Sequence, residues 1–372
     1  MYDLMLGLSA EGVHCDMLCA STEGHPPAEI KLNEYATLFV VHTPIKVAST
    51  MLAPAMITKL RKIARQYDII HIHHPDPMAT LALYLSGYQG KVVLHWHSDI
   101  LKQKTLLKLY RPLQEWLINR ADRIVGTTPR YVHESPFLQH VQHKVDYVPI
   151  GVTPIESDEA GVVAIRNKYE GKNLIFSLGR LVEYKGYEYL IHAAEKLDDR
   201  FHIVIGGKGP LQPALTALIA QLGLQDRVTL LGFMDDSQVA NYYAAADVYC
   251  LSSIWKTEAF AIVQIEAMSC GKPVVSTEIP GSGVSWVNQH DVSGLVVARQ
   301  NAGALAGAIK RICTDPILYQ QYAAGSLDRY HTYFTREKMI QKCLEVYGVV
   351  LQREVKTIIK IKKTNKAVLV AG

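Results

Sequence analysis

The stretch SIWKTEAFAIVQIEAMSCGKPVVS, residues 253–276, carries the clearest folding pattern in the chain. An apolar strand from Asp247 to Leu251 precedes it, and a loop then leads to a helix predicted from about Ala259 to Cys270. Gly271 and Pro273 should end that helix, because glycine favours a helix C-terminus and proline cannot continue one. Another short apolar strand follows and ends at Ser276. Strand, helix and strand in this order are typical of a parallel sheet with crossover helices.

The same alternation runs along the chain in two series, which predicts an α/β protein with two Rossmann-like doubly wound domains. The predicted strands of the first series are Val13–Cys19, Thr37–Val41, Asp68–His73, Lys91–Trp96, Arg123–Thr127 and Lys144–Val148. Those of the second series are Asn173–Leu178, Phe201–Ile205, Val228–Leu231, Asp247–Leu251, Pro273–Ser276 and Gly294–Val297. The carboxyl ends of the strands of both sheets should face a common cleft, where such folds bind ligands.

Pro and Gly residues between the two series, in Val148–Pro154, indicate a linker. We therefore place one domain at residues 1–150 and the other at 151–335. A helix over 336–352 is expected to return to the first domain. The tail Arg353–Gly372 has six Lys or Arg residues against one Glu and no clear periodicity, so we expect a mobile basic segment.

The beginning of the chain is unusual, because Met1–Ser9 already reads as an amphipathic helix with no strand before it. A doubly wound domain normally opens with a strand and a glycine-rich turn. Both are predicted to be missing here, which would leave neighbouring strands with unpaired backbone groups.

Composition narrows the class of protein. Apolar residues make up 49% of the 372 residues and charged residues 20%, which is ordinary for a folded chain. No apolar run approaches the length of a membrane span, and no secretory signal is recognisable, so we expect a cytoplasmic protein. The six cysteines lack the spacing of a zinc or disulfide framework. A net charge of +4 is too small to indicate a nucleic-acid partner.

Two carboxylates mark the stretch quoted first. Glu258 precedes the predicted helix and Glu266 lies inside it, about 12 Å further along the helix axis. This span suits a nucleotide sugar beside the start of the helix: one carboxylate accepts hydrogen bonds from sugar hydroxyls, the other holds the ribose, and the helix amides face the diphosphate. The alternative is a solvated acidic residue at each position.

Two cations follow the strand Asn173–Leu178, in FSLGRLVEYKG (176–186). Arg180 and Lys185 stand at the carboxyl end of a strand beside a helix start, where they can neutralise a diphosphate leaving group. The chain contains no D-x-D triplet, the usual carboxylate pair that holds a metal ion on a nucleotide sugar, so we expect no metal and no cofactor. The alternative is a surface salt bridge with Glu183.

Two glycine-rich turns are weaker signals. Gly206–Pro210 follows a strand and opens a helix, so the backbone there can approach a nucleotide, although a tight turn explains it equally well. Pro280–Gly283 is either a phosphate-facing turn or merely a turn.

Histidines gather at two strand ends of the first domain. Strand alternation places His71 with His73, and His95 with His97, on common faces. Zinc must be considered, but the cluster lacks spaced carboxylate or cysteine ligands, and histidines satisfied by hydrogen bonds in the sheet are the preferred reading for His71 and His95. His97, last on its strand and facing the predicted cleft, is assigned to the reaction.

Together these motifs resemble those of the retaining GT-B glycosyltransferases of family four, the group 1 glycosyl transferases, from Met1 to about Leu351. Residues 96–100, 258–260 and 264–268 are especially similar to bacterial enzymes of polysaccharide and lipopolysaccharide synthesis. The resemblance implies His97, Arg180, Lys185 and Glu258 as catalytic residues. It implies donor binding by Gly179, Arg180, Lys185, Gly207, Gly209, Glu258, Phe260, Ala261, Ile262 and Glu266. The sequence departs from the family at Ala261 and Lys208, where glycine and an acidic residue are usual, and in the missing first strand.

By this resemblance the chain transfers a hexose, with retention, from a nucleotide diphosphate sugar to a glycan or lipid-linked acceptor, with a lean towards GDP-mannose or a related GDP sugar. In the family, attack occurs from the front face, and the departing phosphate oxygen helps to deprotonate the acceptor. An inactive nucleotide-sugar-binding protein, a GT-B epimerase or phosphorylase, and a zinc hydrolase remain alternatives.

The segment Ile100–Arg120 adds a hypothesis about location. It combines basic residues, among them Lys102, Lys104 and Lys108, with leucines and aromatic side chains in one amphipathic helix. This pattern fits either a helix packed on the core with a basic edge, or a peripheral contact with an anionic membrane surface.

Overall fold

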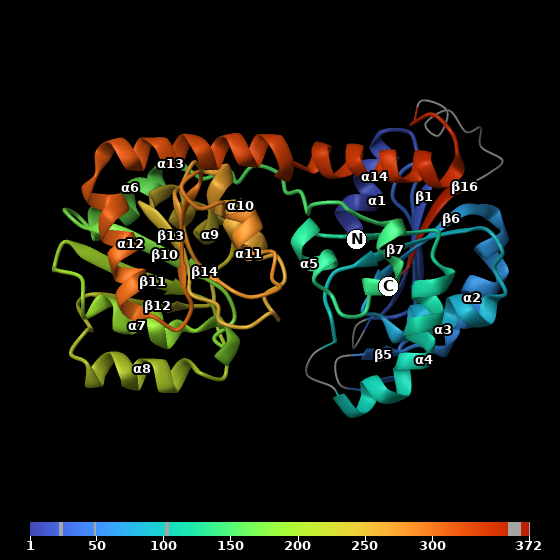
Figure 1. Cartoon of the computed structure of the whole chain (residues 1–372), viewed down its shortest axis with the longest axis horizontal. Helices are drawn as coiled ribbons and strands as arrows, with labels where there is room; N and C mark the ends of the chain where they lie inside the picture. The colour runs from blue at the N-terminus through green and yellow to red at the C-terminus, as the bar shows by residue number, and fades with distance from the viewer. Residues whose placement is uncertain (22–24, 48–49, 101–103, 356–365, 372) are drawn as a thin grey trace. The chain divides into compact units, whose positions relative to one another are not determined.

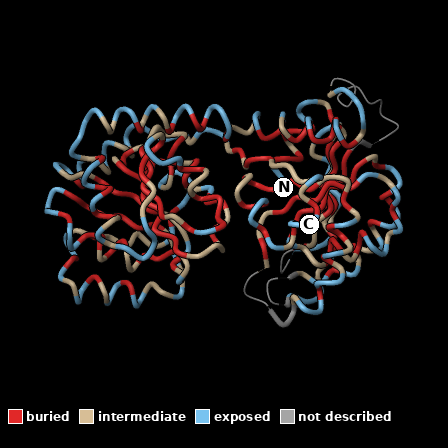
Figure 2. Tube along the Cα trace, in the orientation of Figure 1, coloured by how far each residue is buried: buried red, intermediate tan, exposed pale blue. Residues whose placement is uncertain are grey.

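The computed structural model describes the chain except for residues 22–24, 48–49, 101–103, 356–365 and 372. The chain forms two compact units, one of Met1–Pro149 with Arg336–Gly372 and one of Ile150–Thr335 (Figure 1). Each unit has its own sheet and its own core, and Figure 2 shows the buried residues concentrated along the strands of each.

The sheet of the first unit has the strand order β2-β3-β1-β16-β6-β7-β8-β9. Its strands are β1 Cys15–Ala20, β2 Ala28–Lys31, β3 Thr37–Val41, β6 Tyr67–His74, β7 Lys91–Trp96, β8 Arg123–Gly126, β9 Val145–Tyr147 and β16 Lys366–Ala371. The pair β2–β3 is antiparallel and the other neighbours are parallel. Strands β4 Ile45–Val47 and β5 Thr50–Leu52 form a separate antiparallel pair.

Strand β16 is the main departure from the sequence-based expectation. It lies between β1 and β6, in the middle of the sheet, where Figure 1 shows its red arrow among the blue strands. It is parallel to both neighbours: Val370 lies opposite Met17 of β1 and His71 of β6. Side chains from Val368 to Ala371 are completely buried.

Two expectations are therefore corrected. The basic tail is not a mobile segment over Lys366–Ala371, because these residues form a central strand; residues 356–365 lie outside the described part of the chain. The expectation that neighbouring strands have unpaired backbone groups is also wrong. A doubly wound sheet has its first strand in the middle, and β16 takes that place.

The helices of the first unit come from both of the chain segments that form it. They are α1 Tyr2–Ala10, α2 Pro54–Ile63, α3 Pro77–Ser86, α4 Lys104–Arg120, α5 Pro129–His133 and α14 Arg336–Leu351, with 3-10 turns at Ala64–Gln66 and Gln139–Lys144. Leu8 of α1 and Tyr347 of α14 share one apolar core with Val370 of β16, so segments from both ends of the chain close the same sheet.

The second unit has the strand order β12-β11-β10-β13-β14-β15. The strands are β10 Asn173–Leu178, β11 Phe201–Gly206, β12 Val228–Gly232, β13 Val248–Leu251, β14 Val274–Glu278 and β15 Gly294–Ala298. The helices are α6 Glu159–Lys168, α7 Tyr187–Ala194, α8 Gln212–Gln221, α9 Asp236–Ala245, α10 Ile262–Ser269, α11 Val284–Val287, α12 Ala302–Thr314 and α13 Pro316–Arg329, with a 3-10 turn at Glu183–Lys185 and a π-helical turn at Tyr330–Phe334.

Alternate residues of β10 belong to different cores of this second unit. Ile175 packs in a cluster with α7, α8 and α12, whereas Leu174 and Phe176 pack in a cluster with α9, α10 and α11. Because successive side chains of a strand point to opposite faces, both faces of the sheet are covered by helices. The predicted doubly wound class is thus confirmed for this unit.

The twelve strands predicted from sequence all form, three of them with the predicted bounds: Thr37–Val41, Lys91–Trp96 and Asn173–Leu178. Among the described residues, no helix combines the length and the apolar character needed to cross a membrane.

Candidate active site

Lys185 and Glu258 form a buried ion pair in the second unit. Lys185 ends the 3-10 turn after β10, and Glu258 lies in the loop between β13 and α10. The Lys185 Nζ atom is 2.5 Å from Glu258 Oε2, and the two side chains are 9% and 10% exposed. The Ser253 hydroxyl donates to the same carboxylate oxygen at 2.8 Å. Lys185 thus pairs with Glu258, and the alternative salt bridge of Lys185 with Glu183 is wrong.

The two loops that carry this pair are locked to each other. The Ser252 hydroxyl donates to the Lys185 carbonyl at 2.9 Å, and the Ile254 amide donates to the Tyr184 carbonyl at 2.8 Å. Gly186 has φ +61°, and a Cβ there would lie 2.4 Å from the Ser252 carbonyl oxygen, so only glycine fits. These backbone contacts between the two loops therefore fix where the Lys185 ammonium and the Glu258 carboxylate lie.

The turn Pro280–Gly283 forms hydrogen bonds with the loop that carries Glu258. The Ser282 hydroxyl donates to the Glu258 carbonyl, and the Gly283 amide donates to the Ala259 carbonyl at 2.9 Å. Of the two readings of this turn, the structure favours a structural role, because its polar groups bind the loop.

The start of α10 differs from the prediction. The helix begins at Ile262 rather than near Ala259, because Ala261 has the left-handed values φ +63° and ψ +77°. Glu266 therefore lies about one turn inside the helix. Phe260, within the loop, is buried, whereas Ile262, the first residue of the helix, is 40% exposed.

Glu266 accepts a hydrogen bond of 2.7 Å from the hydroxyl of Tyr243 on α9. Burial raises the pKa of Glu266, and the bond from Tyr243 opposes that shift. The predicted solvated alternative does not hold for Glu258 and holds only partly for Glu266, which is intermediate in exposure.

Arg180 and the glycines lie in the neighbouring turns. Arg180 follows Gly179 at the end of β10 and is exposed. A Cβ on Gly207 would lie 2.1 Å from the Gly179 carbonyl oxygen, and one on Gly209 would lie 2.3 Å from the Leu181 carbonyl oxygen. The Gly207 amide donates to the Gly232 carbonyl at 2.7 Å. Close packing of two turns thus accounts for both glycines.

His97 follows β7 in the first unit. Its amide donates to the His74 carbonyl at 3.1 Å, and its Nε2 atom lies 2.7 Å from Nδ1 of His73. Burial, with a smaller contribution from the chain's amino terminus, lowers the pKa of His97 to about 4, so the ring is neutral at neutral pH.

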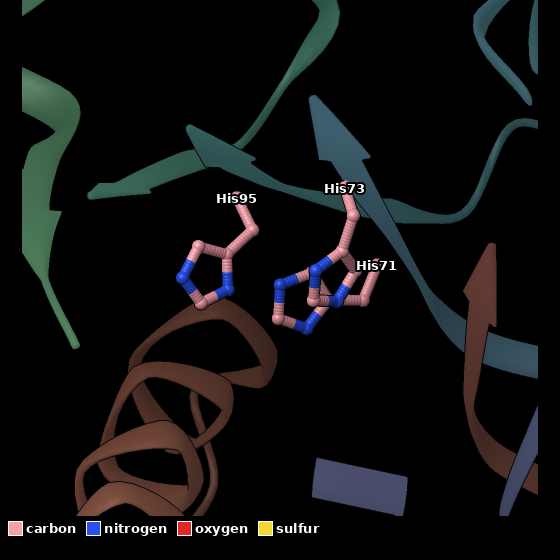
Figure 3. Close-up of side chains that lie close together, drawn as sticks. All are labelled: His71, His73 and His95. Atoms are coloured by element: carbon pink, nitrogen blue, oxygen red, sulfur yellow. The ribbon is translucent and has the colours of Figure 1, made fainter. Parts of the chain in front are cut away.

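The other histidines are only partly as predicted. His71 is satisfied at one nitrogen: its Nδ1 is hydrogen-bonded to the Tyr347 hydroxyl at 2.6 Å, whereas its Nε2 has no partner among the described residues. His95 is not satisfied: within the described chain neither of its ring nitrogens has a hydrogen-bond partner. His71, His73 and His95 lie close together, with their rings gathered above α14 (Figure 3). Burial lowers the pKa of all three, in the case of His71 to about 3.

Sequence reasoning missed three partners of these side chains. Ser253 bonds Glu258, Tyr243 bonds Glu266, and Tyr347 bonds His71. Ser253 carried a usable signal, since it is the second residue after β13 and lies in the same loop as Glu258. Tyr243 and Tyr347 carried none, because each lies on a helix whose apolar pattern explains it as core.

Comparison with known proteins identifies the family of the chain. Residues 158–326 match the model of "Glycosyl transferases group 1" and residues 1–154 match that of "Glycosyltransferase Family 4". The O-antigen chain mannosyltransferase C of Escherichia coli is 30% identical over 356 residues, covering 95% of this chain and 94% of that protein. The D-rhamnosyltransferase WbpZ of Pseudomonas aeruginosa is 30% identical over 329 residues, covering 87% and 84%.

Solved structures agree in fold. HepE of Anabaena, in complex with UDP, superposes with a TM-score of 0.72 at 18% identity, covering 91% of this chain and all of that one (100%). Sucrose-phosphate synthase from Thermosynechococcus elongatus gives a TM-score of 0.74 at 22% identity, covering 94% and 92%. The chain has the GT-B architecture of two Rossmann-like domains and belongs to glycosyltransferase family 4, the group 1 glycosyl transferases.

Proposed function

We propose that this chain is a retaining, metal-independent glycosyltransferase that moves a hexose from a nucleotide diphosphate sugar to a glycan or lipid-linked sugar in cell-surface polysaccharide synthesis. The observation that carries the proposal is the buried Lys185–Glu258 pair at 2.5 Å, held by loops that interlock. An ammonium and a carboxylate fixed before the substrate arrives need no reorganisation during the reaction. Two relatives are named as a mannosyltransferase and a rhamnosyltransferase, which supports a hexose as the group transferred.

Each charged residue has a part in this proposal. Lys185 and the exposed Arg180 neutralise the diphosphate as the bond between the sugar C1 and the phosphate oxygen breaks. Glu258 accepts hydrogen bonds from the sugar hydroxyls and Glu266 from the ribose. The acceptor oxygen forms its bond to C1 on the face that the phosphate leaves, and its proton passes to the departing phosphate oxygen. His97 orients or polarises the sugar as a neutral imidazole.

The donor is proposed to be GDP-mannose or a related GDP sugar. The mannosyl and rhamnosyl relatives favour this choice, whereas the structures of HepE hold UDP. A panel of GDP, UDP, dTDP and ADP sugars tests it by thermal shift, because a ligand that binds the folded state raises the melting temperature by mass action. Stabilisation by UDP sugars alone would replace the GDP assignment and leave the enzyme class intact.

Transfer itself is tested with labelled donor and extracted lipid-linked oligosaccharide. The expected product retains the anomeric configuration of the donor, read by NMR of the new linkage, and forms equally well with excess EDTA. Inversion, or a loss of activity that manganese or magnesium restores, would contradict the proposal. Donor consumption without acceptor would point instead to an epimerase, phosphate-dependent release to a phosphorylase, and donor binding without turnover to an inactive binding protein.

We also propose a cytoplasmic location with a peripheral membrane contact. Tyr110 and Leu117 of α4 are buried in the first unit, which favours the core-packed reading of that helix. Lys108 remains exposed beside Leu109, which is 84% exposed. Lys102 lies outside the described residues. Co-sedimentation with anionic liposomes should fall when Lys108 and Leu109 become glutamate, and unchanged binding would reject the contact.

A further inference from the structure

His71, His73 and His95 form a buried group of imidazoles that the transfer reaction does not use. They come from the carboxyl-terminal halves of β6 and β7, and their exposed fractions are 0%, 5% and 3%. One nitrogen atom from each ring can be chosen so that all three lie within 4.8 Å of one another. Figure 3 shows the ring of His95 turned towards those of His71 and His73.

Four nitrogens of these three rings have no hydrogen-bond partner among the described residues. His71 uses Nδ1 for Tyr347 and leaves Nε2 free; His73 uses Nδ1 for His97 and also leaves Nε2 free. Both nitrogens of His95 are unpartnered. Leaving buried polar atoms unpaired is costly, at roughly 1–3 kcal/mol for each group, so a cluster of four calls for an occupant.

The pattern of used and free nitrogens is that of a metal site. A metal-bound histidine usually binds through one nitrogen and bonds the other to a neighbouring group, which fixes the tautomer and the orientation of the ring. His71 and His73 both show this arrangement, with Nε2 as the free atom. His74 also has two ring nitrogens without a hydrogen-bond partner among the described residues, but its ring lies flat on Trp96, with the centroids 3.8 Å apart, outside the group.

We propose that His71, His73 and His95 bind one divalent transition-metal ion of the zinc type, through Nε2 of His71, Nε2 of His73 and one nitrogen of His95. Imidazole ligands suit zinc and its neighbours, and three histidines with an open fourth position are an established zinc set. Zinc bonds of about 2.0–2.1 Å place the ligand nitrogens about 3.3 Å apart, so the rings must close by about 1.5 Å from the present spacing. That closure requires rotation of the three side chains.

The role of the ion is structural. Val370 of β16 pairs with His71, and Tyr347 of α14 bonds it, so the ion would join β6 and β7 beside the strand and the helix that come from the end of the chain. The site does not include Lys185 or Glu258, and it meets the proposed reaction at the bond between His73 Nδ1 and His97 Nε2, so metal content and donor binding are measured separately. Its failure and the failure of the transferase proposal can therefore be told apart.

The experiment begins with metal analysis of the full-length protein, stripped by a chelator and then loaded with Zn²⁺ or Co²⁺. We expect about one ion per chain, a visible Co²⁺ absorption band of tetrahedral type, and X-ray absorption showing three imidazole nitrogens at about 2.0–2.1 Å. The loaded protein should melt at a higher temperature than the stripped one, while donor binding measured below both melting points stays unchanged. A chain that binds no ion after loading, or whose bound cobalt lacks imidazole ligands, overturns the proposal and leaves buried water as the occupant.

Matched variants sharpen the assignment. His95→Gln removes a ligand and should abolish the cobalt band, whereas His74→Gln, at an equally buried neighbour, should keep it. Tyr347→Phe removes only the bond to His71 and should weaken zinc affinity about 10- to 100-fold. Loss of the band in His74→Gln and its retention in a folded His95→Gln would contradict the site. If His95→Gln does not fold, the wild-type X-ray absorption decides.

Discussion

Lys185 and Glu258 shield each other's charge at a place where water reaches only about a tenth of either side chain, 9% and 10% respectively. Breaking one partner of such a pair leaves the other as an unpaired buried charge, which costs about 3–5 kcal/mol. A variant that loses activity by unfolding says nothing about catalysis. The pair therefore has to be tested with substitutions that keep its shape.

We expect Glu258→Gln to lower kcat/KM by at least about tenfold, because the amide keeps the volume but loses the charge that holds the sugar. Glu258→Gln should also lower stability, because it leaves Lys185 as a buried charge without its partner, and Glu258→Ala should lower it further because it leaves a cavity as well. The double variant Lys185→Met with Glu258→Gln should recover stability in urea denaturation without recovering transfer. Near-normal transfer by Glu258→Gln would remove Glu258 from the proposed donor site.

The raised pKa of Glu266 predicts that donor affinity depends on pH. Burial raises its pKa, so the carboxylate that would hold the ribose is lost at a higher pH than for an ordinary glutamate. Donor affinity should fall as the pH drops towards that raised pKa, and Glu266→Gln should bind more weakly at neutral pH but without this dependence. Isothermal titration across the pH range measures both.

The same shift affects stability with a definite sign. A raised folded-state pKa means that the protonated side chain favours folding; this contribution is present below the unfolded pKa and is lost as the pH rises through the folded value. Glu266→Gln should therefore be at least as stable as the wild type at pH 7. A clear loss of stability there would show that the bond from Tyr243 outweighs burial.

At the scale of single elements, α10 begins at a strained residue. Ala261 has φ +63°, a region that costs a non-glycine residue about 1 kcal/mol or more. Ala261→Gly should raise the free energy of unfolding by a few tenths to about 1 kcal/mol, since relief of strain competes with the greater freedom of glycine in the unfolded chain. The control is Ala304→Gly, within α12, which should be destabilising. Equal losses in both variants would mean that the left-handed backbone is absent.

Strand β16 is the element whose removal should cost most. Val370 is fully buried between β1 and β6, so Val370→Lys places an unpaired charge in the core and should destabilise the first unit by more than about 3 kcal/mol. Val349→Lys on α14 is the matched control, because that valine is 57% exposed and should tolerate lysine. Urea denaturation followed by far-UV circular dichroism gives both values. Equal stability of the two variants would place Lys366–Ala371 outside the sheet.

These elements also show how far sequence reasoning reaches. Strands such as Lys91–Trp96 were predicted because a buried parallel strand is a continuous apolar run with clear ends. The apolar run of β16 is equally good, but it follows a basic stretch, and its partners lie near residues 17 and 71, so nothing local reveals the pairing. The αL backbone of Ala261 was hidden as well, since alanine is a good helix former.

The candidate site was predictable in composition but not in its contacts. Arg180, Lys185 and Glu258 could be named because charged residues at the carboxyl ends of strands are typical of doubly wound ligand sites. The contact between Lys185 and Glu258 depends on how two loops pack against each other. The periodicity of apolar residues in the sequence does not reveal that packing. His95 was expected to be satisfied, because the sequence cannot show which buried nitrogens find partners.

For the whole molecule, the two units differ in how they are assembled from the chain. Residues 150–335 are contiguous and contain a complete sheet and its cores, so this fragment should fold alone with a cooperative unfolding transition. Residues 1–149 lack α14 and β16 and should remain partly unfolded. Circular dichroism and amide exchange of the two fragments provide the measurement. A stable fragment 1–149 would show that β16 is dispensable.

Strand β16 finally has a consequence for how the protein is made. Synthesis proceeds from the amino terminus, and domains generally fold as they emerge from the ribosome. Ile150–Thr335 can therefore fold while Met1–Pro149 still lacks β16, because β16 is translated after all the strands with which it shares the sheet. During that interval β1 and β6 expose unpaired backbone edges, which are templates for aggregation. The first unit should therefore be the part of a nascent chain that depends most on chaperones.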